Sequence, residues 1–354
     1  MRKVIFFTIS LFIGLLLFVV AMQQAGVSDV LKAVSLFPPL MIFFVFLINS
    51  IAICVVGSLR WKMIIESQNK HKISFIKVLR AKLVGFTVSY ITPSVLVGGE
   101  PVRVYMIKEE GGYNWEESFA SVVIDQVIYF FSLFLLMVAG FLFLVNHFSL
   151  PAEIFCGFGV IVIAVVFILH LFYSKALNGN LGEDGFFMFI IKTARLNKIK
   201  FIKSKEKNIK RTEGIISRFF KTKKEIFLKA FLLAILEGIL YLIVICSIIL
   251  CFDSAGIFEL TQSVSIFFLL TLANFVPIPG SLGSFEASLT FIFELLNLGK
   301  SNGFTFSLIY RFINIALVIV GFFVLIHFEI TTVSHKFSAE APKALLRIHR
   351  FLKK

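Results

Sequence analysis

The chain has 354 residues, of which 58% are apolar and only 16% are charged, and its mean hydropathy is +0.94. Soluble globular proteins are about 25% charged, so this composition excludes a soluble enzyme, a disordered chain and a secreted disulfide scaffold. Several apolar runs approach the length of about 20 residues that crosses a hydrocarbon core. The sequence therefore predicts an all-α, polytopic membrane protein.

Six full membrane spans are expected. In chain order they cover residues 4–22, 38–56, 118–145, 152–173, 227–251 and 305–328. The first run follows Arg2 and Lys3, as the core of a signal peptide would. Signal peptides, however, have apolar cores of only about 7–15 residues. The first run is therefore interpreted as a retained span.

The net charge of +14 indicates orientation in the membrane rather than binding of nucleic acid. Segment 59–82 holds seven basic residues and one acidic residue, and segment 175–226 holds 14 basic and five acidic residues. Short basic segments stay cytoplasmic, so these two, both termini and the tail 336–354 are expected inside. The weakly charged loops expected outside are 23–36, 146–151 and 252–262. Segment 175–226 is interpreted as a cytoplasmic loop facing lipid headgroups, with a patch for anionic lipid as the alternative.

Two further apolar stretches, 75–107 and 262–298, are interrupted in the middle. The residues that break the helices are Pro93, Gly98 and Gly99 in the first, and Pro277, Pro279, Gly280 and Gly283 in the second. Pro removes a backbone donor, and Gly costs about 1 kcal/mol relative to Ala in a helix interior. A single crossing by either stretch would place a basic segment outside. Each stretch is therefore predicted to be a re-entrant helical hairpin, with two short spans as an equivalent alternative for 262–298.

The two breaks resemble each other. Pro93 precedes Glu100 by seven residues, and Pro279 precedes Glu286 by the same interval. Together with entry from opposite sides, this spacing predicts inverted repeats, each composed of a span, a hairpin and a span. In transporters built this way the broken helices meet near the midplane and direct their N-termini at anionic groups.

Polar residues at membrane depth are candidates for substrate binding or transport, because a charge at the bilayer centre costs about 2.5–3.5 kcal/mol. The candidates are Glu100, Arg103, Asp125, Glu237, Asn274, Glu286, Tyr310 and Arg311. Structural roles stay open for some of them. Glu100 can pair with Arg103 at i, i+3, and Glu286 can stabilise the first turn of a half-helix. Asp125 is a candidate partner for an Arg on a hairpin.

The sequence contains no signature of a known enzyme class. It has no GxSxG, no Walker loop, no HExxH, and no CxxC among its four cysteines. No catalytic residue, metal site or cofactor is predicted, and an enzymatic activity is not favoured. Arg60, beside Trp61, is interpreted as an interfacial anchor rather than a substrate-binding residue.

A set of motifs spread over roughly 5–330 resembles the lysylphosphatidylglycerol synthase transmembrane-domain family, also described as flippase-like. The motifs are LRW at 59–61, GGEPVRVY at 98–105, Asp125, PIPGSLGSFE at 277–286 and YR at 310–311. The resemblance implies a membrane domain over 1–335 in the cytoplasmic membrane of a prokaryote. In this family the domain is thought to move an aminoacylated phospholipid between leaflets. Long members add a soluble synthase domain, which this chain is expected to lack.

The leading hypothesis is therefore a lipid transporter. Arg103 and Arg311 would bind a phosphate, while Glu100, Glu237 and Glu286 would balance a cationic headgroup or carry a proton. The expected partners are membrane lipids: an anionic or aminoacylated phospholipid, or a polyprenyl-linked lipid. The alternatives are an intramembrane lipid-headgroup transferase and a membrane partner that anchors a soluble lipid or glycan synthase. The sequence leaves open the lipid, the energy coupling and the oligomeric state.

Overall fold

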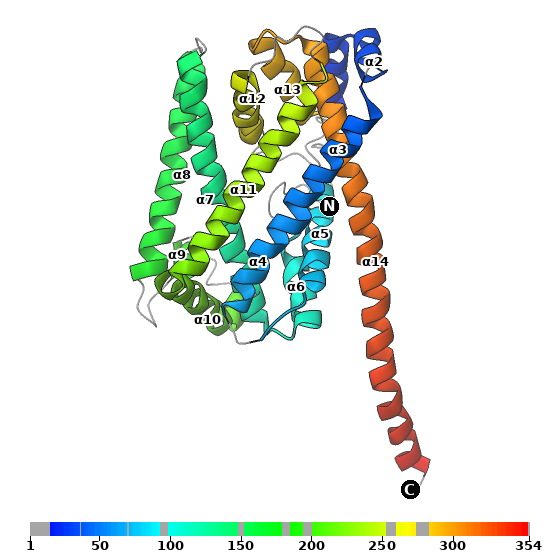
Figure 1. Cartoon of the computed structure of the whole chain (residues 1–354). Helices are drawn as coiled ribbons and strands as arrows, with labels where there is room; N and C mark the ends of the chain where they lie inside the picture. The colour runs from blue at the N-terminus through cyan, green and yellow to red at the C-terminus, as the bar shows by residue number, and fades with distance from the viewer. Residues whose placement is uncertain are drawn as a thin grey trace.

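The computed structural model describes residues 15–35, 37–68, 71–92, 98–147, 152–178, 185–193, 200–252, 260–273 and 283–352. Within these ranges the regular structure is entirely helical, which confirms the prediction of an all-α membrane protein. The helices, labelled as in Figure 1, are α2 (Val27–Ser35), α3 (Pro39–Ser50), η1 (Ile51–Val56), α4 (Gly57–Glu66), α5 (Phe75–Ile91), α6 (Glu100–Gly111), α7 (Trp115–His147), α8 (Ala152–Asn178), α9 (Phe186–Thr193), α10 (Lys200–Thr222), α11 (Lys224–Ile249), α12 (Leu260–Ala273), α13 (Ser284–Leu295) and α14 (Lys300–Leu352).

Five helical stretches in the described part of the chain are long and apolar enough to cross a membrane, and they match five of the predicted spans. They are Pro39–Glu66, Trp115–Phe143, Cys156–Lys175, Lys224–Leu250 and Lys300–Glu329. A sixth is counted if Leu15–Ala25 and Val27–Ser35 form one span, bent by 81°. The bend lies at Gly26, whose φ is +78°. Residues 4–14 of the predicted first span lie outside the described residues.

The spans form a bundle whose outer surface is apolar. Large side chains such as Val160 on α8 (67% exposed), Ile163 on α8 (71%) and Phe323 on α14 (67%) point away from the protein. This surface fits contact with lipid tails. Helix α2, which lies in the weakly charged segment 23–36, and the basic helix α10 lie at opposite ends of the bundle (Figure 1). That separation agrees with the predicted sidedness, and which end faces the cytoplasm stays a prediction.

The predicted hairpins correspond to α5 with α6 and to α12 with α13. These helices have 17, 12, 14 and 12 residues. At about 1.5 Å per residue each is shorter than the roughly 30 Å of hydrocarbon, which favours re-entry over full crossings. The two hairpins lie toward opposite ends of the bundle, as inverted repeats require (Figure 1). The predicted break residues Pro93, Pro277, Pro279 and Gly280 lie outside the described residues.

Three segments predicted as loops are helical, which corrects the sequence interpretation. Segment 23–36 contains α2, residues 59–66 continue the second span as α4, and segment 175–226 contains α9 and α10. The reason in α10 is an apolar face at helical spacing, where Ile216 and Phe219 are buried against the bundle. The basic residues on the other face of α10 give segment 175–226 the composition of a loop, which is why its helices were not predicted.

A π-helical segment, η1, joins α3 to α4 without interrupting the span. Its Ala52 and Ile53 are buried, and Gly57 follows directly. A Cβ atom at Gly57 would lie 2.9 Å from Cε of Lys82, so the glycine lets the α5 lysine cross close to the start of α4. Segments of π-helix occur frequently at functional sites. Here the segment directly precedes the helix that carries Arg60.

Candidate functional site

Five helices each contribute one charged residue to a buried group, called here the charge cluster. Its members are Arg60 of α4, Lys82 of α5, Arg103 of α6, Asp125 of α7 and Glu237 of α11. The side chains of Arg60 and Asp125 have no exposed surface. The cluster therefore lies where three spans and the first hairpin meet.

Asp125 is the centre of the cluster, because three cations share its carboxylate. Its Oδ1 accepts a hydrogen bond from Nε of Arg60 at 2.7 Å. Its Oδ2 accepts from Nη2 of Arg103 at 2.6 Å and from Nζ of Lys82 at 3.2 Å. Bonds between ionised groups are roughly twice as strong as neutral ones, so Asp125 ties α4, α5 and α6 to α7.

Two glutamates complete the charge balance. Arg60 donates from Nη1 to Oε2 of Glu237. Glu100 lies at the edge of the cluster, with its Oε1 4.0 Å from Nη1 of Arg103 and accepting a hydrogen bond from the Gln126 amide. With Glu100 included, three cations face three carboxylates. Such balance is needed because an uncompensated buried charge is strongly destabilising.

Aromatic rings hold the two guanidinium groups in place. The Arg103 guanidinium lies 4.1 Å from the ring centroid of Trp61, and that of Arg60 lies 5.1 Å from the Tyr129 ring. The Trp61 indole donates a hydrogen bond to Oγ of Ser121 at 3.0 Å. Cation–π contacts add attraction where water is excluded, so each arginine is held by ring faces as well as by carboxylates.

The first hairpin brings Arg103 to the cluster through a close approach of α5 and α6. A Cβ atom at Gly99 would lie 1.8 Å from the carbonyl oxygen of Gly85, and one at Gly85 would lie 2.5 Å from Cγ of Arg103. The backbone N–H of Gly99 donates to Oγ of Ser89 at 2.8 Å. Gly99, which was predicted as a helix breaker, thus also allows, together with Gly85, the contact that positions Arg103.

Some polar atoms of the cluster have no hydrogen-bond partner among the described residues. They are Nη2 of Arg60, Nε of Arg103 and Oε2 of Glu100. Each such buried group costs about 1–3 kcal/mol if it stays unpaired. The side chains of Lys82 and of Glu100 at the edge of the cluster are 12% and 14% exposed, more than those of the other four members. Two donors and one acceptor of this group of charges are therefore left unsatisfied by the described residues.

A second ionic contact, the Glu286–Arg311 pair, joins the second hairpin to α14. Arg311 donates from Nε to Oε1 of Glu286, whose Oε2 accepts from the backbone N–H of Gly283 at 2.6 Å. The Tyr310 ring stacks on Phe285 with centroids 5.5 Å apart. Glu286 therefore stabilises the N-terminus of its own helix, as the structural alternative predicted, and also binds α14.

The structure divides the predicted site residues into two groups. Those in or beside the charge cluster are Glu100, Arg103, Asp125 and Glu237, and those in the second contact are Glu286, Tyr310 and Arg311. The prediction that Asp125 partners a hairpin arginine is confirmed, because Arg103 binds it. Arg103 and Arg311 pair with different carboxylates. Asn274 lies outside the described residues.

Two members of the cluster, Arg60 and Lys82, were not predicted as site residues. The interpretation of Arg60 and Trp61 as interfacial anchors is wrong, because both side chains are fully buried. The apolar run continues as helix beyond Val56, which carries Arg60 into the bundle. Lys82 follows two other basic residues of α5. Its position further from the start of that helix is the sequence feature that could have identified it as a buried site residue. Among the described residues, no three His, Cys, Asp or Glu side chains are grouped to hold a metal ion.

Comparisons with known proteins agree with this architecture. A UPF0104 membrane protein of Methanothermobacter thermautotrophicus is 26% identical over 243 residues, which are 67% of this chain and 70% of the relative. A second UPF0104 membrane protein of the same organism is 23% identical over 319 residues, or 86% and 88% of the two chains. One from Methanocaldococcus jannaschii is 27% identical over 172 residues, or 48% and 50%.

No solved structure matches the chain. The sequence model of the lysylphosphatidylglycerol synthase TM region matches residues 7–321, far more than half of the length. This protein therefore belongs to the lysylphosphatidylglycerol synthase transmembrane-region family.

Proposed function

We propose that this protein moves a phospholipid between the two leaflets of its membrane and that the charge cluster binds the phosphate of the headgroup. The observation that carries the proposal is the convergence of charged residues from five helices inside an apolar bundle. Ionisable residues within membrane-spanning segments usually mark a substrate or ion pathway. Membership of the lysylphosphatidylglycerol synthase family supports a lipid as the substrate.

The unpaired donors favour a phosphate. Nη2 of Arg60 and Nε of Arg103 are buried without partners among the described residues. Guanidinium groups match phosphate oxygens in geometry, and bonds between them are charge-assisted. A phosphodiester would accept from both arginines while Asp125 keeps their other donors engaged.

Glu100 is suited to the cationic part of a headgroup. Its Oε2 is an unpaired buried acceptor, and its side chain is among the more accessible in the cluster. A primary amine or an aminoacyl ammonium could donate to this oxygen. Local pairing of both headgroup charges lowers the cost of carrying them through hydrocarbon. This arrangement favours a zwitterionic or aminoacylated phospholipid over a neutral lipid.

The Glu286–Arg311 pair is assigned a positioning role. Glu286 is fully buried and binds both its own helix N-terminus and α14. Those contacts fix α13 against the long helix that also packs on α5. The pair would therefore hold the two hairpins in register during transport instead of binding the headgroup.

The test is lipid exchange between leaflets in liposomes that contain the purified protein. Fluorescent-headgroup phosphatidylglycerol, phosphatidylethanolamine and lysylphosphatidylglycerol would be compared in wild type, Arg103→Gln and Lys108→Gln. Lys108 is the matched control, because it lies on α6 but is exposed and pairs with Glu109. We expect protein-dependent exchange to fall by about tenfold or more in Arg103→Gln, because the lipid phosphate loses its charged hydrogen-bond donor. Exchange should be unchanged in Lys108→Gln.

Two results would contradict the proposal. Exchange that is no faster than in protein-free liposomes, with each lipid and with an imposed proton gradient, would exclude lipid transport. Equal exchange in all three proteins would retain transport and remove Arg103 from its path. Lipid extracts from expressing cells would be analysed by mass spectrometry in parallel, because a headgroup of changed mass would indicate the transferase alternative.

A further inference from the structure

Helix α10 has two contrasting faces at one end of the bundle. Its Ile216 and Phe219 are buried, and the Phe220 ring lies 5.7 Å from that of Phe172 on α8. Glu213 accepts hydrogen bonds from the backbone N–H groups of Phe187 and Met188, which fixes α9 to α10. These contacts hold α10 across the ends of the spans (Figure 1), and the basic residues on its other face are exposed.

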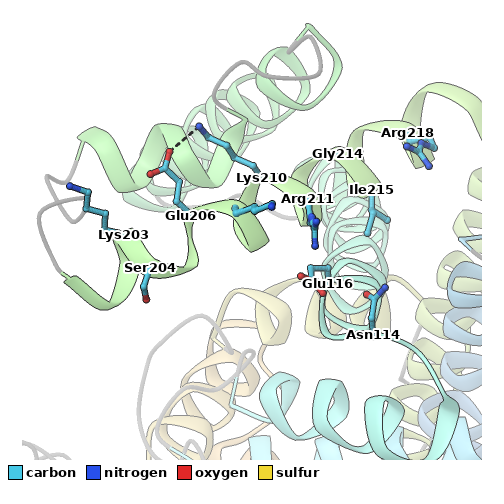
Figure 2. Close-up of a pocket in the computed structure, with 11 residues that line it drawn as sticks. Asn114, Glu116, Lys203, Ser204, Glu206, Lys210, Arg211, Gly214, Ile215 and Arg218 are labelled. Atoms are coloured by element: carbon cyan, nitrogen blue, oxygen red, sulfur yellow. Dashed lines mark ion pairs between the residues drawn. The ribbon is translucent and has the colours of Figure 1, made fainter.

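An open groove of about 890 Å³ runs along this basic face. Its basic lining residues are Lys203, Lys207, Lys210, Arg211 and Arg218. Asn114 and Glu116, at the beginning of α7, form the facing side, toward which Arg211 points in Figure 2. Glu206 is the second acidic lining residue and pairs with Lys210 at 2.9 Å. Basic residues therefore outnumber acidic ones by five to two in the groove.

The free charge of the groove is concentrated on α10. Among the described residues, Lys207, Arg211 and Arg218 have no recorded ion pair, and all three are exposed. Lys207 and Arg211 are four residues apart, so they lie on the same side of the helix. The charge complement of such a surface is an anionic group.

The position of the groove determines which anion can reach it. The span Trp115–Phe143 begins one residue after Asn114, and the span Lys224–Leu250 begins two residues after α10 ends at Thr222. The groove is therefore level with the ends of two spans, where lipid headgroups lie. Trp115 is 46% exposed beside the groove, as aromatic side chains at membrane–water interfaces commonly are.

We propose that the α10 groove binds the headgroups of anionic phospholipids in the leaflet at this end of the bundle. Basic residues near an anionic surface strengthen binding by on the order of fivefold each. Lys207, Arg211 and Arg218 would bind the phosphates, while the apolar face of α10 keeps the helix in the interfacial plane. This site is separate from the charge cluster, and it does not depend on transport.

The test is lipid binding to the full chain purified in neutral detergent. Phosphatidylglycerol and phosphatidylcholine would be titrated separately, with native mass spectrometry to measure the bound fraction. The double variant Lys207→Gln/Arg211→Gln would be compared with Lys223→Gln/Lys224→Gln, which removes two exposed charges from the same end but outside the groove. A thermal melt of each variant would confirm that it is folded.

We expect wild type to prefer phosphatidylglycerol and the groove variant to bind it about tenfold or more weakly, with the control unchanged. Equal weakening in both double variants would overturn the proposal, because it would report net charge alone. No preference for phosphatidylglycerol would also overturn it. So would binding of inorganic phosphate or of an RNA oligonucleotide in place of the lipid, with the same dependence on Lys207 and Arg211.

Discussion

The two hairpins share a spacing of Pro, Gly and Glu but use their charged residues differently. The first supplies Lys82, Glu100 and Arg103 to the charge cluster or its edge. The second supplies Glu286, which binds its own helix N-terminus and Arg311. A matched motif therefore specifies where the helix breaks, whereas the helices packed around it determine what the carboxylate does.

The two sites also differ in redundancy. Asp125 has three cationic partners, so the loss of any one cation leaves two. Glu286 has Arg311 as its recorded cationic partner among the described residues. Because a buried charge without a partner is costly, single substitutions should separate the two sites clearly.

The largest effect is expected from Asp125→Asn. The change keeps the shape of the side chain but leaves Arg60, Lys82 and Arg103 without their shared anion. We expect the free energy of unfolding in mixed micelles to fall by about 3–5 kcal/mol, measured by detergent titration. The control is Glu225→Gln, which removes an exposed carboxylate paired with Lys229 and should cause no measurable change. A stability equal to wild type would show that Asp125 does not hold the cluster together.

Arg311→Gln tests the second site. It removes the cationic partner that buried Glu286 has among the described residues and leaves its contact with the backbone N–H of Gly283, and we expect a loss of about 3 kcal/mol in the same titration. Adding Glu286→Gln should recover much of this loss, because the glutamine can still accept from the backbone while carrying no charge. If the double variant is less stable than Arg311→Gln alone, the loss is not caused by an unpaired carboxylate.

Glycine substitutions compare the two breaks directly. Gly99→Ala places a Cβ 1.8 Å from a backbone oxygen of α5, so the two helices must separate, at about 2–3 kcal/mol. Gly283→Ala adds strain at φ +78°, at about 1–2 kcal/mol. Thermal melting gives both costs. Only Gly99→Ala should reduce lipid exchange, and equal loss of exchange in the two variants would contradict the difference between the hairpins.

Lys82→Met should have the smallest effect on stability. Asp125 keeps Arg60 and Arg103, and methionine fills much of the volume without a charge to desolvate. We expect a change below about 1 kcal/mol by the same detergent titration, since the substitution leaves no carboxylate in or beside the cluster without a cationic partner, which is the situation that costs several kcal/mol. A loss as large as that of Arg311→Gln would show that the cluster is no more redundant than the pair.

Much of the fold could be predicted from the sequence, because hydrocarbon thickness sets the length of a span whatever its partners. Five predicted spans and the helices on either side of both breaks follow from run length and from Pro and Gly. α10 could also have been found, because Ile215, Ile216, Phe219 and Phe220 recur at helical spacing. The basic residues between these apolar positions make that period hard to recognise.

The charge cluster was only partly predictable. A charged residue within an apolar run can be identified from the sequence alone, which is why Asp125 and Glu237 were predicted as site residues. Their partner Arg60 is 65 and 177 residues away in the chain, and a single sequence contains no signal for such pairings. Arg60 lies just after an apolar run and beside Trp61, and this pattern is typical of an interfacial anchor. Only the packing of α4 against α7 and α11 shows otherwise.

The π-helical segment can absorb a change in chain length ahead of the cluster. In an α-helix each residue advances the side-chain direction by about 100°, whereas π-helical hydrogen bonds reach one residue further along the chain and each residue advances the direction by less. Loss of one residue between 51 and 56 would therefore convert the segment to α-helix and leave Arg60 facing Asp125. Alignments of related chains that place a single gap in this segment would thus keep the residues of α4 on the same face of the helix.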